Sequence, residues 1–276
     1  MSKLLRLQLL FSWLSLDVVF GAMASMYFFQ ELVHVKLEGS TYILLALAVW
    51  TLYSLDHLLD ARQSNGSSSP RRVFYRQNKI ALSLGILVAV VAGLTGAFYW
   101  LGWDKELQLT LVLIVAMGGC RWAIQKLGPV VLKEVSIALF YVVGSLWLPI
   151  LRSEAQDLSW QALAFAIVFF MLALLNLWML SFLDREDDRQ DGFISIAMLL
   201  PPIQMIQWIR KLAFLGIFGT MASFILLPSF YRPFSCVLLL VFLVHYLTFF
   251  QSGLSATGKR QRMEISFWIP WLLLWI

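Results

Sequence analysis

Long apolar segments recur along almost the whole chain, separated by short polar connections. A membrane-spanning helix needs about 20 predominantly apolar residues, and on that criterion the sequence predicts nine spans. They lie near residues 10–33, 41–60, 79–101, 107–125, 132–151, 160–184, 211–229, 232–250 and 264–276. Only 13% of the 276 residues are charged, whereas roughly a quarter are charged in a soluble domain. The pattern therefore predicts an integral membrane protein with a single membrane domain, residues 1–276.

Helices are favoured over a membrane barrel. A barrel strand is a segment of about ten residues with alternating hydrophobicity, and no such segments recur here. In lipid each backbone polar group must be satisfied within the spanning structure, which uninterrupted helices achieve. The expected fold is an all-α bundle, and one membrane domain of this size leaves no room for a soluble catalytic module. Any chemistry must lie in or at the bundle.

Basic residues are distributed unevenly between the two sets of connections. One set contains a single cation per loop, namely Lys36, Lys105, Arg152 and Arg232, and the other set contains all the remaining Lys and Arg residues. Cytoplasmic loops carry such an excess of Lys and Arg, so the amino terminus is predicted to be cytoplasmic. The net charge of +5 is thereby explained by topology, and no nucleic-acid partner is expected. A bacterial cytoplasmic membrane is the default location.

Two predicted helix ends carry pairs of aspartates four residues apart. Asp56 and Asp60 follow the apolar segment that begins at Tyr42, and Asp184 and Asp188 follow the one that begins at Trp160. Residues four apart lie on one face of a helix, one turn from each other. Both pairs fall on the predicted cytoplasmic side. Carboxylates are typical ligands of hard divalent cations, so the four aspartates predict a shared magnesium site that also performs the chemistry.

The connections beside these pairs have distinct compositions. Residues 61–79 begin with a Ser/Gly/Asn run that we expect to be mobile, and they end with Arg71, Arg72 and Arg76. These arginines either clamp phosphate groups through their bidentate fork or bind anionic lipid headgroups. Residues 192–211 contain Pro201 and Pro202 and are predicted to form an interfacial helix over the cytoplasmic mouth of the bundle.

The second acidic stretch resembles a motif of the UbiA-type membrane prenyltransferases. Its pattern there is Asp-x-Glu-Asp-Asp followed by Gly and Ser, and it is matched in register by Asp184, Glu186, Asp187, Asp188, Gly192 and Ser195. The first motif of that family reads Asn-Asp-x-x-Asp-x-x-x-Asp. This chain matches only its last two acids, Asp56 and Asp60, because Leu52 and Tyr53 occupy the Asn and first Asp positions.

The resemblance implies a bundle of helices around a central cavity and a magnesium-dependent reaction. A prenyl group would pass from an isoprenoid diphosphate to an aromatic or lipid-like hydrophobic acceptor within the membrane. The bound cations would neutralise charge on the leaving diphosphate, assisted by basic side chains. The candidates are Arg71, Arg72, Lys126 and Lys133. An allylic cation needs a water-poor, aromatic-lined chamber, for which the candidates are Trp50, Tyr53, Tyr141 and Trp178.

Two further polar residues lie inside predicted spans. Asp17 lies in the first span, where a carboxylate facing lipid would cost about 2.5–3.5 kcal/mol on insertion scales. We expect Asp17 to point into the cavity, where it either contacts a substrate or is a protonated core acid. Asn176, two turns before Asp184, presents the same choice.

Other interpretations of the acidic motifs remain open. Some UbiA-type proteins cyclise terpenes, and Tyr53 could then donate a hydrogen bond to the diphosphate. A transporter or a scaffold for lipid enzymes is the non-enzymatic alternative, although transporter sites usually lie near the membrane midplane. A CDP-alcohol phosphotransferase is rejected because its two Asp pairs belong to one continuous signature. Here the second pair lies far from Asp60-Ala61-Arg62.

Overall fold

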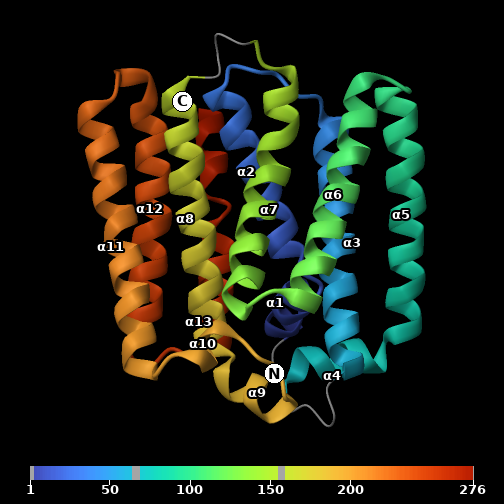
Figure 1. Cartoon of the computed structure of the whole chain (residues 1–276), viewed down its shortest axis with the longest axis vertical. Helices are drawn as coiled ribbons and strands as arrows, with labels where there is room; N and C mark the ends of the chain where they lie inside the picture. Colours follow the sequence, from blue (N-terminus) through green and yellow to red (C-terminus); the bar gives the residue numbers. More distant parts are fainter. Residues whose placement is uncertain (1–2, 64–68, 155–158, 276) are drawn as a thin grey trace.

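The computed structural model describes residues 3–63, 69–154 and 159–275, and every regular element among them is helical (Figure 1). The helices in chain order are α1 (Lys3–Trp13), α2 (Leu16–Leu32), α3 (Gly39–Gln63), α4 (Pro70–Gln77), α5 (Lys79–Leu101), α6 (Lys105–Leu127), α7 (Val130–Arg152), α8 (Trp160–Leu183), α9 (Arg185–Asp191), α10 (Ile196–Leu199), α11 (Pro202–Leu226), η1 (Ser229–Tyr231), α12 (Arg232–Phe250), α13 (Ala256–Ser266) and η2 (Ile269–Trp275). The predicted all-α class is confirmed.

Seven of these helices are long and apolar enough to cross a membrane, which makes the chain a multi-pass membrane protein. An eighth span results if the bent pair α1 and α2 is counted as one. The predicted ninth span, 264–276, instead contains the end of α13 and the 3₁₀ helix η2. Seven residues at a rise of about 2.0 Å each reach only about half of the ~30 Å hydrocarbon thickness. Nine spans are therefore not confirmed.

The first predicted span is broken near its amino-terminal end. Residues 7–13 and 16–32 form two helices that meet at an angle of 64°. Ser15, which precedes α2, has a φ of 55°, a left-handed conformation that costs a residue with a side chain about 1 kcal/mol or more. The break brings Asp17 into the first turn of α2.

The two connections that carry the acidic motifs lie at the same end of the bundle. Figure 1 shows α4, which follows α3, and α9, which follows α8, at the end where α1 lies. The basic part of residues 61–79 forms α4, whereas the stretch expected to be mobile lies mostly outside the described residues. The interfacial helix predicted for 192–211 is wrong. Only α10 precedes Pro202, which begins the long helix α11, because proline is well tolerated in a first helical turn.

The core of the bundle is formed by aromatic rings from α2, α8 and α12. Phe28, Phe165, Phe169 and Phe234 are fully or almost fully buried, and their ring centroids lie 5.3–6.2 Å apart in several pairs. Edge and tilted contacts at such distances stabilise an apolar core. Because rings fill this region, the predicted central cavity is not confirmed.

We predict that Gly216 sets the separation of α11 and α12. A Cβ at this position would lie 2.1 Å from the Phe242 ring, whereas one at Gly219, on the same helix, would meet nothing within 4 Å. Overpacking costs roughly 1–3 kcal/mol. Gly216→Ala should lower the midpoint of thermal unfolding in detergent, and Gly219→Ala should leave it unchanged or raise it slightly. Equal midpoints for the two variants would contradict this packing.

Candidate functional site

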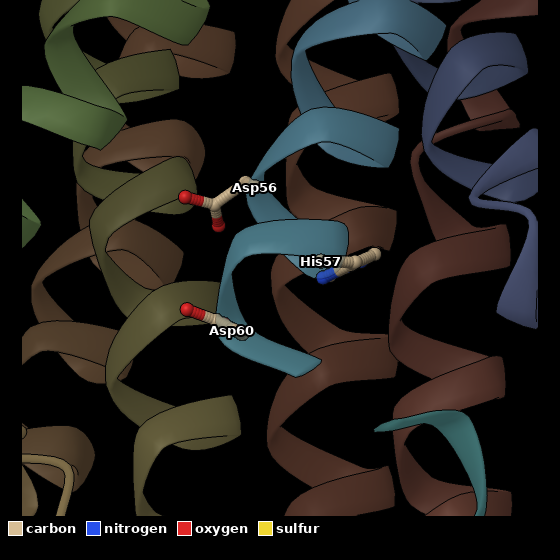
Figure 2. A group of neighbouring side chains, drawn as sticks. All are labelled: Asp56, His57 and Asp60. Carbon is tan, nitrogen blue, oxygen red and sulfur yellow. The ribbon is translucent and has the colours of Figure 1, made fainter. Parts of the chain in front are cut away.

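The first acidic motif lies at the end of α3 that is followed by α4. One oxygen from each of Asp56 and Asp60 and one ring nitrogen of His57 all lie within 4.8 Å of one another. Figure 2 shows the two aspartates projecting from the same side of α3, while His57 leaves the helix on the other side. The sequence prediction that the carboxylates share a face is confirmed, and His57, which it left without a role, adjoins them.

The second motif forms the junction of α8 and α9. Asp184 caps the end of α8, and three acidic residues occupy the first turn of α9, where they interact favourably with the positive end of the helix dipole. Gly192 ends α9 with a φ of 77°, the left-handed conformation that glycine adopts at a helix end. The Phe193 amide then donates to the Asp188 carbonyl over 2.9 Å.

Arginines from distant parts of the chain pair with the acids of this motif. Arg72 of α4 donates to Asp188 over 2.7 Å and also pairs with Asp191, and Arg260 of α13 pairs with Asp184. The guanidinium of Arg72 also lies 4.6 Å from the centroid of the Phe193 ring. One arginine therefore joins the chain after the first motif to the second motif, which the sequence separates by more than a hundred residues.

The two motifs also share an electrostatic environment. The positive charges of Arg72 and Lys133 act on both Asp60 and Asp188. His57 lies in the field of Arg71, Arg72 and Arg260. The predicted phosphate-binding residues Arg71, Arg72 and Lys133 thus all act electrostatically on Asp60 of the first motif, and Arg72 also contacts the second motif directly.

A second buried acid accompanies Asp17. The side chains of Asp17 and Glu264 interact directly, and both residues are less than a tenth exposed. Arg260 lies 3.8 Å from Glu264, and Ser12 donates to Glu264 over 3.5 Å. Burial, followed by the charge of Asp17, raises the pKa of Glu264. Asp17 therefore points into the protein, toward a partner from α13.

Glu264 and Arg260 were missed by sequence reasoning. Arg260 was counted only as one of several basic residues before the last predicted span, and Glu264 falls on the first residue of that span. The signal was present, because the two residues are four apart and carry opposite charge on one helix face. What the sequence lacks is any indication that this face packs against Asp17 and Asp184.

Glu134 on α7 is another site residue that the sequence did not reveal. It is 7% exposed, and its Oε1 accepts from Ser181 over 3.2 Å and from the Ile196 amide over 2.9 Å. Its Oε2 is buried and has no hydrogen-bond partner among the described residues. Glu134 thereby joins α7, α8 and α10, directly beside the predicted site residue Lys133. The spacing of the Asp pairs gives no indication of Glu134.

Of the remaining predicted site residues, some lie near the Asp motifs and others do not. Tyr53 lies against His57, with ring centroids 6.3 Å apart. The Oδ1 of Asn176 accepts a hydrogen bond from Nε2 of the buried His245 over 3.2 Å. Lys126 is exposed on α6, with its ammonium 4.8 Å from the Trp122 ring, and no described contact joins it to the acids. Lys126 and Asn176 are thus not brought into contact with the two Asp motifs.

The donor set at the first motif fits magnesium. Two carboxylates supply hard oxygen ligands, and opposite ligands of Mg²⁺ lie about 4.2 Å apart, so small side-chain rotations would bring Asp56 and Asp60 onto one ion. His57 is a less usual magnesium ligand. The second motif differs, because Asp184 and Asp188 are paired with guanidinium groups. Coordination by these two acids would require the arginines to exchange partners.

We predict that the pair of Arg260 with Asp184 makes stability depend on pH. Burial alone would raise the pKa of Asp184, but Arg260, together with Arg71 and Arg72, holds the pKa below its ordinary value. The carboxylate therefore stabilises the fold fully above the pKa of the unfolded state, about 3.9, and this contribution is lost as pH falls through the lower folded pKa.

Arg260→Gln should lower the unfolding midpoint at about pH 7 and weaken the further loss of stability as pH falls below about 4. Thermal unfolding in detergent measures both. Arg262→Gln is the matched control, since Arg262 is exposed and donates to the neutral Gln251 over 3.0 Å. A pH profile of Arg260→Gln identical to that of the parent protein would exclude this ion pair as a source of acid sensitivity.

Comparison of the chain with protein-family models, with curated proteins and with solved structures gives no match. The functional interpretation therefore depends on the residues of the site and on the motif resemblance. Of these, the pairing of Arg72 with Asp188 and Asp191 is the contact that links the two motif regions most directly.

Proposed function

We propose that this chain is a membrane prenyltransferase that moves an isoprenoid group from a prenyl diphosphate to an aromatic or lipid-like acceptor. The observation that carries the proposal is the position of Arg72, which lies in the helix that follows the first Asp pair and is ion-paired with Asp188 and Asp191 of the second motif. Carboxylates mixed with partly buried arginines form a site for a metal-bound diphosphate, because phosphate oxygens bind guanidinium groups and magnesium alike. The resemblance to the UbiA-type prenyltransferases supports the same assignment.

The arginines would bind the diphosphate by exchanging their present partners. Arg72 has a planar fork that now spans Asp188 and Asp191, and Arg260 pairs with Asp184. A phosphate offers the same bidentate geometry as a carboxylate. Binding of the diphosphate would draw these guanidinium groups away from their carboxylate partners and leave the acids of the second motif free. The ion pairs thus keep the site organised in the absence of substrate.

Magnesium held by Asp56 and Asp60 would neutralise the charge that develops on the diphosphate as the allylic carbon–oxygen bond breaks. Arg71 and Lys133 are positioned to add positive charge beside it. The acceptor would lose a proton after the new bond forms, and the candidate to receive it is Glu134, whose buried Oε2 has no hydrogen-bond partner among the residues that the structure describes. Each of these groups acts at the end of the bundle where α4 and α9 lie.

The prenyl chain would lie among aromatic side chains on the membrane side of the polar site. Tyr53 lies one turn from His57 on α3, and the half-buried Trp178 of α8 has a buried indole Nε1 that finds no hydrogen-bond partner in the described part of the chain. Tyr141 of α7 shares a 2.9 Å hydrogen bond with Ser25. Aromatic faces stabilise an allylic cation and exclude water from it. Trp50 is less suitable, because its ring contacts Gly85 of α5.

Two alternative functions remain, a terpene cyclase and a non-enzymatic transporter or scaffold. A terpene cyclase is favoured by Tyr53, which replaces an acid of the first motif with a hydrogen-bond donor, and it would release diphosphate together with a hydrocarbon. A transporter or scaffold is favoured by the pairing of Asp184 and Asp188 with arginines, which a purely structural role would also explain.

We propose the cytoplasmic membrane, with the amino terminus on the cytoplasmic side, as the location.

The metal requirement is tested with purified protein, labelled farnesyl or geranylgeranyl diphosphate and a membrane extract that supplies the acceptor. Magnesium should give a labelled product larger than the donor, and its removal with EDTA should abolish turnover. Asp56→Asn/Asp60→Asn should lower turnover at least about 100-fold, as loss of a metal site does. Asp104→Asn, an exposed aspartate at the other end of the bundle, is the control. Diphosphate release with only hydrocarbon would assign a cyclase, and no turnover would leave the non-enzymatic role.

A separate prediction concerns Arg72. Arg72→Lys retains the positive charge but cannot span Asp188 and Asp191 or a diphosphate with a planar fork. We expect a loss of roughly 10–100-fold in kcat/KM for the prenyl diphosphate, about 1.4–2.7 kcal/mol in transition-state stabilisation. Arg76→Lys on the same helix, where the residue is exposed, should change nothing. Equal kinetics for Arg72→Lys and the parent would contradict a bidentate role.

A further inference from the structure

A groove on the outside of the bundle lies apart from the Asp motifs. It consists of two adjoining open hollows of about 540 Å³ and 220 Å³, both bordered by Arg62 and Lys79. The smaller hollow extends to Arg76, and the larger one extends along α5 past Ile80, Leu84 and Leu87. Cations at one end and apolar side chains at the other make the groove amphipathic.

The three cations of this groove have no acidic partner. Among residues 3–63, 69–154 and 159–275, no ion pair involves Arg62, Arg76 or Lys79. This distinguishes them from Arg72 and Arg260, which are held by carboxylates. Lys79 also begins α5, where the backbone amides of the first turn lack partners within the helix and favour an anion. Three cations together with these amides form a binding site for a phosphate.

The apolar part of the groove continues from the cations into the membrane. Ile80, Leu84 and Leu87 lie on one face of α5 and are 58–71% exposed. From residue 80 to residue 87 the helix rises by about 10 Å, so the face reaches into the hydrocarbon layer. Free phosphate would leave this face uncovered, whereas an acyl chain would cover it.

We propose that the groove binds an anionic phospholipid, with the headgroup phosphate between Arg62, Arg76 and Lys79 and one acyl chain along Ile80, Leu84 and Leu87. The site is distinct from the Asp motifs. Arg62 follows Asp60 by two residues, about 200° around α3, so it emerges on the opposite side of the helix. The inference therefore does not depend on the proposed function, and either one can fail alone.

Native mass spectrometry of the purified full-length protein in detergent tests the site. Phosphatidylglycerol and phosphatidylcholine with the same acyl chains are titrated in parallel. The parent protein should bind phosphatidylglycerol at least tenfold more tightly. Each cation contributes about a fivefold effect on an anionic lipid, so Arg62→Gln/Arg76→Gln/Lys79→Gln should weaken binding of phosphatidylglycerol roughly 100-fold and weaken binding of phosphatidylcholine, whose headgroup has no net charge, much less.

The control variant is Lys36→Gln/Lys105→Gln/Arg232→Gln, which removes the same charge at the opposite end of the bundle. Undiminished binding to the first triple variant would overturn the proposal, and so would an equal loss in the control. Displacement of phosphatidylglycerol by an equal concentration of inorganic phosphate would assign the groove to free phosphate instead. If thermal unfolding shows that the triple variant is misfolded, the single variants replace it. Arg62→Gln should lower the affinity for phosphatidylglycerol about fivefold, and Arg62→Lys should retain that affinity.

Discussion

The end of the bundle where α4 and α9 lie is held together by guanidinium groups that pair with carboxylates from distant segments. Arg72 joins α4 to α9, and Arg260 joins α13 to the end of α8. A partly buried charge is costly in isolation, and removing one partner of a buried pair costs roughly 3–5 kcal/mol. The pairs therefore specify how the connections fold back over the helix ends. Every other property of the polar site depends on this arrangement.

Much of the fold follows from hydropathy, because a lipid environment admits few alternatives. The apolar segments at 79–101, 160–184 and 232–250 predicted helices whose bounds agree with the structure within a residue or two. The failures occur where helices are not limited by the membrane. Ser15 breaks the first span through a local backbone conformation, and α11 begins at Pro202 because a helix can extend beyond the hydrocarbon layer.

The candidate site was only half predictable for a related reason. Asp56 and Asp60 could be found because spacing within one helix reports a shared face. The same spacing pointed to Asp184 and Asp188, but the single helix predicted for that pair is wrong, because Asp184 lies at the junction of α8 and α9. Glu264 and Glu134 could not be found, since their importance comes from contacts between helices that no spacing encodes. The same limitation applies to Arg260. Nothing in its neighbourhood indicates that it pairs with Asp184 rather than with lipid, because the partner lies 76 residues away.

Two interpretations of the second acidic motif can be reconciled through charge balance. A metal site requires free carboxylates, whereas the structure pairs Asp184 and Asp188 with arginines. A site that handles a metal-bound diphosphate must remain stable both with and without about three negative charges, and internal ion pairs are a direct way to achieve this. Substrate phosphate would replace the carboxylates on Arg72 and Arg260, and metal ions would replace the arginines on the carboxylates. If the chain is the proposed prenyltransferase, the ion pairs would be the substrate-free form of the same site, and the cations of Arg62, Arg76 and Lys79, which form no ion pair within the described ranges, would belong to the membrane surface.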